Sequence, residues 1–410
     1  ITAALAPIAG AIADYKGYKK KLFVCFFALG LAFTALCAIS DNWRVLFAGY
    51  IFSHVGFAGS CVLYDSFLPD VTVPERMDRL SGWGYAIGYI GGSTIPFLIS
   101  IALIQFGDNW GMNTAGAVKA SIWLTVIWWG GFTVPFLKNV RQNSYIEKPE
   151  SGFLSHAFSN IFETARKIIR NKGLLLFIIA YFFYIDGVGT IISLATSYGT
   201  QLGLGMLGMI LALLVTQIVA FPCSIIFSKL SKKVGALNMI TAAVALYAVI
   251  CVIGFFMGFL IEAAEIPAKL AALASQGVNL QNPGNLNIIN AALRDASVPD
   301  SVWNAQPAYL NAISHSTVLF WILATLVGTV QGGIQALSRS YYGKIIPPEN
   351  SGEYFGFFEI FGKFAAILGP LLYAFTKALL GRSSFSILSI IFLFGAALVF
   401  LTVGRRHMRQ

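Results

Sequence analysis

Charged residues are scarce in this sequence of 410 residues: Asp, Glu, Lys and Arg make up 11%, while apolar residues make up 57%. A soluble domain carries about a quarter charged residues, so this chain has too few polar groups to cover a water-exposed surface. The apolar residues instead fall in blocks of about twenty, the length of helix that crosses a bilayer. Because a backbone in lipid must satisfy its own hydrogen bonds, and because the alternation of barrel strands is missing, the sequence predicts an all-α membrane protein.

Cysteine is also scarce, and its placement excludes several kinds of site. The five cysteines lie in apolar blocks without the spacing of a metal site or a disulfide framework; they are Cys25, Cys37, Cys61, Cys223 and Cys251. No loop gathers a Ser/His/Asp group, and no complete phosphate-binding loop is present. The sequence therefore predicts no metal, no cofactor and no enzyme activity, and it offers no machinery for hydrolysing ATP.

Eleven apolar spans are expected, the first of which is too short to cross a bilayer. They are 1–13, 22–40, 43–64, 82–105, 117–137, 173–198, 203–227, 237–261, 316–338, 354–376 and 385–404. The first span begins at Ile1 without an initiator methionine or a signal-peptide pattern, so we interpret it as the end of a truncated helix. One lost helix would bring the number to twelve, which divides into two bundles of six.

Lys and Arg are concentrated on one side of these spans. If the loop at residues 14–21 is cytoplasmic, 21 of the 28 basic residues lie in cytoplasmic loops. This bias follows the positive-inside rule and explains the net charge of +10 by contact with an anionic leaflet. A nucleic acid is the alternative partner of a basic chain; the loop bias favours the lipid bilayer and no nucleic acid.

An internal repeat supports the division into two bundles. A shift of 274 residues aligns Gly59 with Gly333, Pro74 with Pro348, Glu75 with Glu349, Gly82 with Gly356, Gly88 with Gly362 and Pro96 with Pro370. Repeats of this kind are typical of secondary transporters, whose substrate site lies where the two halves meet. Chance matches in a glycine-rich chain are the alternative.

The domain boundaries follow from the longest cytoplasmic loop. We expect an N-terminal bundle (1–137), a cytoplasmic linker (138–172) and a C-terminal bundle (173–404). Phe153 to Ile169 of the linker is amphipathic and is expected to form a helix on the membrane surface. Residues 262–315 are expected to form an outward-facing insert, with short helices at Ala263–Leu273 and Leu286–Arg294.

The loop after the first span carries the clearest motif, Gly10-Ala-Ile-Ala-Asp14-Tyr-Lys-Gly17-Tyr-Lys19-Lys20. Gly10 allows two helices to approach, Gly17 allows a tight turn, and Asp14 can cap a neighbouring helix or pair with a base. The pattern resembles the G-x-x-x-D-x-x-G-x-K/R-K signature of the major facilitator superfamily. The resemblance implies the major facilitator fold, with Gly10, Asp14, Gly17 and Lys19 in a lock that closes the cytoplasmic side.

Further motifs point to a narrower family. They are Tyr64-Asp65-Ser-Phe-Leu-Pro69-Asp70, Ser81-Gly82-x-Gly84-x3-Gly88-Tyr89-x-Gly91-Gly92, Tyr184-Ile-Asp186-Gly-Val-Gly-Thr190, Gly332-Gly-Ile-Gln335-Ala-Leu-Ser-Arg339-Ser340 and Tyr354-Phe-Gly356-x5-Gly362-Lys363-x5-Gly369-Pro370. Together they resemble the autophagy-related vacuolar effluxer family and its bacterial relatives, from residue 1 to about 404 without the 262–315 insert. The resemblance implies transport and, from the fungal vacuolar members, amino-acid release. The sequence departs from the family pattern by the expected loss of the first helix and by the 262–315 insert.

Ionisable residues within a span are expensive in lipid and usually face a cavity, so two of them are candidate functional residues. Asp186, midway along its span, is expected to bind a substrate amine or carry a proton, and pairing with a neighbouring helix is the alternative. His54 is expected to relay protons, unless it only bonds a neighbouring helix.

Other polar residues in the spans could have either a functional or a structural role. Glu359 and Lys363 stand four residues apart on one helix face, so they either serve the pathway or pair with each other. Three amides either line the pathway or bond helix to helix, namely Gln217, Gln331 and Gln335.

The repeat also predicts a gate. The 274-residue shift places Asp65 opposite Arg339, each at the cytoplasmic end of its span. We expect these two residues to form a salt bridge only when the cytoplasmic side is closed; two separate solvated charges are the alternative.

The sequence thus predicts a monomeric secondary transporter that works by alternating access on a small-molecule substrate. Proton-coupled export of amino acids or similar metabolites is the leading expectation, and a bacterial inner membrane is favoured over a vacuolar one. The alternatives are an uncoupled facilitator of the same fold and a non-transporting scaffold or receptor that binds a partner through the 262–315 insert.

Overall fold

Helices make up the chain in the computed structural model, which describes residues 2–147, 153–289 and 304–408. The first half contains α1 (Thr2–Ala13), α2 (Tyr18–Ile39), α3 (Trp43–Ser66), α4 (Leu68–Val71), α5 (Pro74–Ile87), a π-helical segment (Gly88–Thr94), α6 (Ile95–Phe106), a 3₁₀ turn (Gly107–Trp110) and α7 (Thr114–Asn139). The second half contains α8 (Phe153–Arg170), α9 (Lys172–Gln201), α10 (Met206–Val234), α11 (Ala236–Ser275), α14 (Pro307–Ile345), α15 (Ser351–Leu380), α16 (Ser383–Ser389), α17 (Ile391–Val403) and α18 (Arg405–Met408), with 3₁₀ turns at Pro283–Asn285 and Pro348–Asn350.

Ten helical segments of the described residues are long and apolar enough to cross a membrane, and the apolar stretch Ala4–Ala13 of α1 is shorter. This agrees with the eleven expected spans, of which the first was too short. The chain is therefore a multi-pass membrane protein. The fifth helical segment of the first half begins earlier than expected, at Pro74, because a proline at the first position of a helix is favourable.

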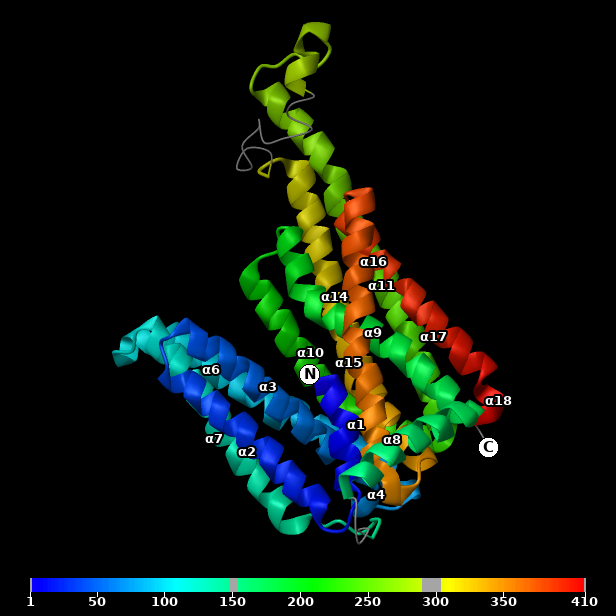
Figure 1. Ribbon diagram of the computed structural model, residues 1–410. Helices are drawn as coiled ribbons and strands as arrows, with labels where there is room; N and C mark the ends of the chain where they lie inside the picture. The colour runs from blue at the N-terminus through cyan, green and yellow to red at the C-terminus, as the bar shows by residue number, and fades with distance from the viewer. Residues whose placement is uncertain (1, 148–152, 290–303, 409–410) are drawn as a thin grey trace.

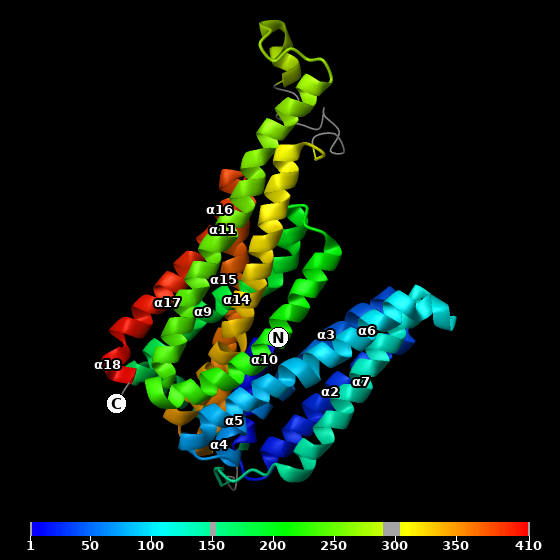
Figure 2. The same ribbon diagram turned by 180° about the vertical axis from the view of Figure 1, so that it is seen from behind.

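The helices form two groups that meet at one end (Figures 1 and 2). In the first group α2 packs against α3 and α7; in the second, α14 packs against α10 and α11. Contacts between the groups run from α1 to α15 and from α5 to α10 and α14. The groups converge near α4 and α8 and diverge towards the opposite end, which is the two-bundle architecture expected from the repeat.

The convergent end carries the basic loops and is called the basic end below; by the positive-inside rule it is cytoplasmic. The linker helix α8 lies here. Its predicted range is confirmed within one residue, and it packs against α1, α9 and α15. Ile161 of α8 contacts the cluster of Ala11 and Tyr15, so the apolar face of this helix is covered at least partly by protein.

The 262–315 insert differs from the expectation. Ala263–Leu273 is not a separate short helix, because α11 continues without interruption to Ser275. Likewise α14 begins at Pro307. The alanine-rich sequence of this stretch favours helix and contains no glycine to end it. Both helices extend beyond the rest of the molecule at the divergent end (Figure 1). The expected helix Leu286–Arg294 is helical to residue 289, and its remainder lies outside the described residues.

Gly10 lets α1 lie directly against α15. A Cβ atom on Gly10 would collide with the carbonyl oxygen of Gly352, and a Cβ on Gly352 would lie 2.6 Å from the carbonyl oxygen of Gly10. Both obstacles are backbone atoms, which cannot rotate away as a side chain can. The close approach of these two helices at the basic end therefore depends on two facing glycines.

We predict that Gly10→Ala separates α1 from α15 and lowers the free energy of unfolding by about 1–3 kcal/mol, the usual result of overpacking. Thermal unfolding in detergent measures this effect. Gly131→Ala on α7 is the matched control, because no atom lies within 4 Å of its Cβ position. Equal melting temperatures for the two variants would contradict the prediction.

Candidate functional site

A cavity of about 580 Å³ lies between the two helix groups. Side chains from α3, α5, α10, α14, α15 and the π-helical segment line it, and five residues expected from the sequence are among them: Gln217, Gln331, Gln335, Glu359 and Lys363. Asp65 and Arg339 lie in the same wall. The folding of the chain thus brings both signs of charge and three amides to one place between the groups, where the repeat predicted a substrate site.

The pair expected on α15 is present but loose. Lys363 Nζ lies 3.8 Å from Glu359 Oε2, which is beyond hydrogen-bond distance. Their side chains are 38% and 22% exposed. Both charged groups therefore face the cavity and are available to a solute that enters it.

The pair expected between the repeats is tight. Arg339 Nη1 donates to Asp65 Oδ1 at 2.8 Å, and Arg339 Nε donates to the Ser81 hydroxyl at 3.0 Å. The guanidinium also lies over the rings of Tyr64 and Tyr85, 5.7 and 4.9 Å from their centroids. Arg339 is therefore fixed by hydrogen bonds and cation–π contacts to the first group, and the Asp65–Arg339 bridge ties α3 to α14.

A narrower apolar pocket adjoins the cavity inside the second group. It has a volume of about 110 Å³, and aliphatic and aromatic side chains dominate its lining. Gln217 and Gln331 line both spaces, so they stand where the two meet. Gln217 Oε1 is buried and accepts no hydrogen bond from the described residues. A buried acceptor without a partner costs free energy, and a ligand N–H group would satisfy it.

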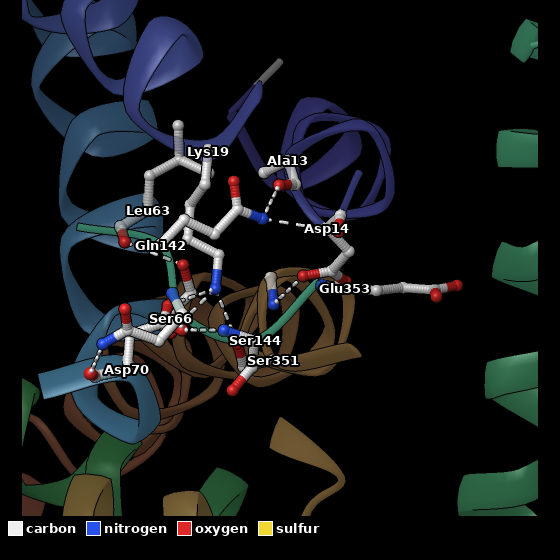
Figure 3. A network of polar contacts seen from close by, with 12 residues as sticks. Ala13, Asp14, Lys19, Leu63, Ser66, Asp70, Gln142, Ser144, Ser351 and Glu353 are labelled. Carbon is white, nitrogen blue, oxygen red and sulfur yellow. Dashed lines mark hydrogen bonds and ion pairs between the residues drawn. The ribbon is translucent and has the colours of Figure 1, made fainter. Parts of the chain in front are cut away.

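Asp14 lies at the N-terminus of α15 (Figure 3). Its two carboxylate oxygens accept hydrogen bonds from the backbone N–H groups of Gly352 at 2.7 Å and Glu353 at 2.9 Å. These are the first N–H groups of the helix, which have no partner within it and carry a partial positive charge. The capping that the motif predicted for Asp14 is thus present, and the capped helix belongs to the other group.

Lys19 joins the same network (Figure 3). It is completely buried, and its ammonium donates to Asp70 Oδ2 and to the Ser351 hydroxyl, each at 2.8 Å. Asp70 in turn accepts from the backbone of Asn143 and Ser144 at the start of the linker. Gly17 supplies the turn before α2 with a φ of 76°, a conformation that glycine adopts without steric strain.

Asp78 is a third carboxylate at the basic end, and the sequence reasoning missed it. One of its oxygens accepts from Ser340 and Lys344 of α14, both at 2.6 Å, and the other accepts from Ser231 of α10 at 3.0 Å. Asp78 stands on α5 with no motif around it. Its three partners lie far along the chain on α10 and α14, so no local pattern in the sequence points to it.

The two remaining candidates lie elsewhere. Asp186 is 1% exposed, and both of its oxygens accept the N–H of Gly369 at 3.0 Å, one residue before Pro370 in the interior of α15. This arrangement matches the structural alternative for Asp186. His54 lines a neighbouring cavity of about 660 Å³ bounded by α3, α7 and the π-helical segment. Neither residue lines the cavity between the two helix groups, called the central cavity below.

Two solved structures share this architecture. The Escherichia coli fucose:proton symporter FucP matches 98% of this chain and 87% of its own, with a TM-score of 0.62 and 13% sequence identity. A bacterial homologue of the iron transporter ferroportin, in an outward-facing state, matches 100% of this chain and 88% of its own, with a TM-score of 0.57 and 13% identity. At these identities the likeness concerns the fold alone. The two-bundle architecture with a cavity between the bundles is therefore the major facilitator fold.

Sequence comparison places the chain more narrowly. The profile of the family described as "Vacuole effluxer Atg22 like" matches residues 1–270 and 313–410, and the chain belongs to this family. The unmatched stretch falls within the 262–315 insert.

Two relatives illustrate the range of the family. The Bacillus subtilis (strain 168) protein YxiO, described as an uncharacterised MFS-type transporter, is 40% identical over 405 residues, or 98% of this chain and 81% of the relative. Autophagy-related protein 22-2 of Aspergillus clavatus is 25% identical over 309 residues, or 72% of this chain, which spans 42% of that relative. The Bacillus relative agrees with the favoured bacterial inner membrane, and the family description names the vacuole.

We predict that closure of the basic end is favoured by acid through Asp14. Burial raises the pKa of Asp14 to about 7, against the opposing effects of Lys19 and the two N–H donors. When the groups separate and water reaches Asp14, this pKa falls towards its ordinary value of 3.8. The contribution of Asp14 to closure is therefore complete below about pH 4 and is lost as the pH rises through about 7, by up to about tenfold per pH unit.

Double electron–electron resonance between spin labels attached at Glu75 and Arg406 measures this equilibrium. Both residues are exposed at the basic end, one on each helix group. Asp14→Asn should flatten the pH profile between about pH 4 and 7. Two other carboxylates lie near Asp14. Asp70 already pairs with Lys19, whereas Glu353 is buried and has no such pair among the described residues, so Glu353→Gln is the control for a second titrating carboxylate. An Asp14→Asn profile as steep as the original would contradict the role of Asp14.

Proposed function

We propose that the protein is a secondary active transporter that exports amino acids or similar small zwitterionic solutes, coupled to protons, by alternating access. One observation carries this proposal: the cavity between the two groups presents both signs of charge and is closed at the basic end. Such a cavity suits a solute that carries a carboxylate and an ammonium group.

The loose pair on α15 supports binding of a zwitterion. A substrate carboxylate can pair with Lys363 and a substrate ammonium with Glu359, so that both charges exchange one partner for a better one. Gln217 Oε1, which accepts no hydrogen bond from the part of the chain that the structure describes, provides a further acceptor for the ammonium. The Glu359–Lys363 pair and Gln217 would together recognise the ammonium and carboxylate groups that all amino acids share.

The adjoining apolar pocket supports a preference among side chains. Its volume of about 110 Å³ is somewhat smaller than the roughly 150 Å³ that holds a benzene-sized guest in an apolar protein cavity. With the charged groups held at Glu359 and Lys363, an aliphatic side chain can pass between Gln217 and Gln331 into this pocket. We therefore propose that large aliphatic substrates bind more tightly than small ones.

Three carboxylates support a gate at the basic end. Asp65, Asp14 and Asp78 belong to the first helix group, and each accepts hydrogen bonds from the second helix group. In our proposal these three links hold the cytoplasmic side shut while the opposite side is open, and all three break when the bundles rock. Gly10 and Lys19 take part by allowing the contact of α1 with α15 and by binding Ser351.

Counterflow in proteoliposomes, screened with amino acids, tests the function directly. Accumulation of labelled solute against its gradient supports active transport. Uptake that never exceeds equilibrium would replace the proposal with a facilitator. Absence of flux, together with loss of a bound partner when residues 262–315 are deleted, would replace it with a scaffold.

We predict that Glu359 couples transport to protons, because its carboxylate faces the cavity and exchanges its Lys363 partner for a proton or a substrate ammonium. Glu359→Gln should lower pH-gradient-driven accumulation roughly tenfold or more while counterflow persists. Proteoliposome flux with and without a pH gradient measures both quantities. Glu349→Gln is the matched control, an exposed glutamate in the turn before α15. Asp186→Asn tests the other candidate carboxylate within a span. If Asp186→Asn abolishes proton coupling and Glu359→Gln keeps it, Asp186 and not Glu359 is the coupling residue.

We also predict that filling the apolar pocket removes the side-chain preference. Ala324→Phe on α14 should weaken leucine transport roughly tenfold or more and change alanine transport little, because alanine does not reach the pocket. Competition by unlabelled amino acids measures the order of affinities. Ile322→Phe on the same helix is the control, since this side chain is 44% exposed on the outer surface. An equal loss for leucine and alanine would show that the pocket does not hold the side chain.

A further inference from the structure

A further pocket, of about 760 Å³, lies at the basic end between the start of α2 and the segment that follows α7. Four cationic side chains line it: Lys16, Lys20, Lys21 and Arg141. In Figures 1 and 2, α2 and α7 stand on the side of the first group that faces away from the second group. This basic pocket therefore opens towards lipid and cytoplasm and is separate from the transport cavity.

The charge of the basic pocket is largely unbalanced. Lys16 pairs with Glu147 at 3.1 Å, but this is the only ion pair that the described residues form with the four cations. Lys20 donates to the backbone oxygen of Val140 at 3.0 Å, and the Lys21 ammonium lies 5.5 Å from the ring centroid of Tyr18. Three positive charges are thus available to an anion.

The surface next to these charges is apolar. Val24 and Cys25 line the same pocket one turn further along α2, and both are exposed. Only 17% of the most apolar stretch of α2 is buried within the protein, so this helix presents its side chains to hydrocarbon. A ligand of the basic pocket can therefore have an anionic head and an apolar tail. Basic pockets at the cytoplasmic ends of spans are typical binding places for such lipids.

The walls of the basic pocket also hold the Asp14 loop. Gln142 accepts a hydrogen bond from the N–H of Gly17 at 2.9 Å and donates to the backbone oxygens of Ala13 and Tyr15 at 3.1 and 3.2 Å. A ligand that joins α2 to the segment after α7 would hold these walls together and keep the loop in the position where Asp14 caps α15.

We propose that the basic pocket binds the phosphate head of an anionic phospholipid from the cytoplasmic leaflet, and that this lipid stabilises the conformation closed at the basic end. Lys20, Lys21 and Arg141 contact the phosphate, and the acyl chains lie along α2 beside Val24 and Cys25. Neither binding nor stabilisation requires a transported substrate, so the proposal is independent of the proposed function.

Native mass spectrometry and thermal unfolding of the purified protein, in detergent with added phosphatidylglycerol or phosphatidylcholine, test the binding. Phosphatidylglycerol should be retained and should raise the melting temperature, whereas phosphatidylcholine should not. The triple variant Lys20→Gln, Lys21→Gln, Arg141→Gln should lose roughly a hundredfold in affinity for phosphatidylglycerol. The control Lys229→Gln, Lys232→Gln, Lys233→Gln removes the same charge from exposed positions on α10 and should behave like the original protein.

Two further arms separate the alternatives. Glycerol phosphate and inorganic phosphate should not reproduce the stabilisation; if either does, the pocket binds free phosphate and the lipid assignment is wrong. Spin-label distances between Glu75 and Arg406 should shorten with phosphatidylglycerol in the original protein and the control. Equal retention and stabilisation in the control and pocket variants would overturn the proposal. If the triple variant does not fold, Arg141→Gln alone should weaken phosphatidylglycerol binding, and an unchanged affinity would overturn the proposal equally.

Discussion

Carboxylates of the first helix group that bind the second group are the interaction on which the rest of this structure depends. Removing a carboxylate from water costs several kcal/mol, and the cost is offset only when its partners are well placed. Asp14 has two helix N–H groups, Asp65 has a fixed guanidinium, and Asp78 has a lysine and two hydroxyls. All of these partners belong to the second group. The three carboxylates are therefore stable either with the groups together or in water, and intermediate separations are unfavourable. That two-state character is what alternating access requires.

The repeat explains part of this arrangement, and its imperfection explains another part. Asp65 and Arg339 occupy equivalent positions of the two halves, 274 residues apart, and they meet because equivalent helix ends converge on the axis between the bundles. The Asp14 loop has no acidic equivalent in the second half, where the corresponding segment is Ser228–Gly235 at the end of α10. Instead Asp78 on α5 accepts a hydrogen bond from Ser231 within that segment. In the Asp14 contact the loop supplies the carboxylate, whereas in the contact of Ser231 the helix α5 supplies it through Asp78. Both contacts link the two helix groups.

The sequence predicted the spans, their two groups and the capping by Asp14 well, because lipid restricts the backbone to helices and because the capping motif is local. It was less able to predict features set by packing between distant segments. Nothing near Asp78 reveals its three partners, which lie on α10 and α14. Asp186 has the sequence features of a pathway residue, yet its carboxylate binds Gly369, more than 180 residues away. The expected separate helix at Ala263–Leu273 is instead the end of α11, because the alanines there continue the helix.

The contrast between the two ion pairs in the central cavity supports the different roles that we propose for them. Arg339 and Asp65 lie 2.8 Å apart, and Ser81 and two tyrosine rings restrain the guanidinium, so a solute would have to replace several contacts to separate them. Glu359 and Lys363 lie 3.8 Å apart on one helix and keep a large part of their surface free. A zwitterion can enter the second pair with little loss of existing interaction, and the same entry would be unfavourable at the first. The tight pair therefore suits the gate and the loose pair suits the substrate, although both lie in one cavity and consist of the same chemical groups.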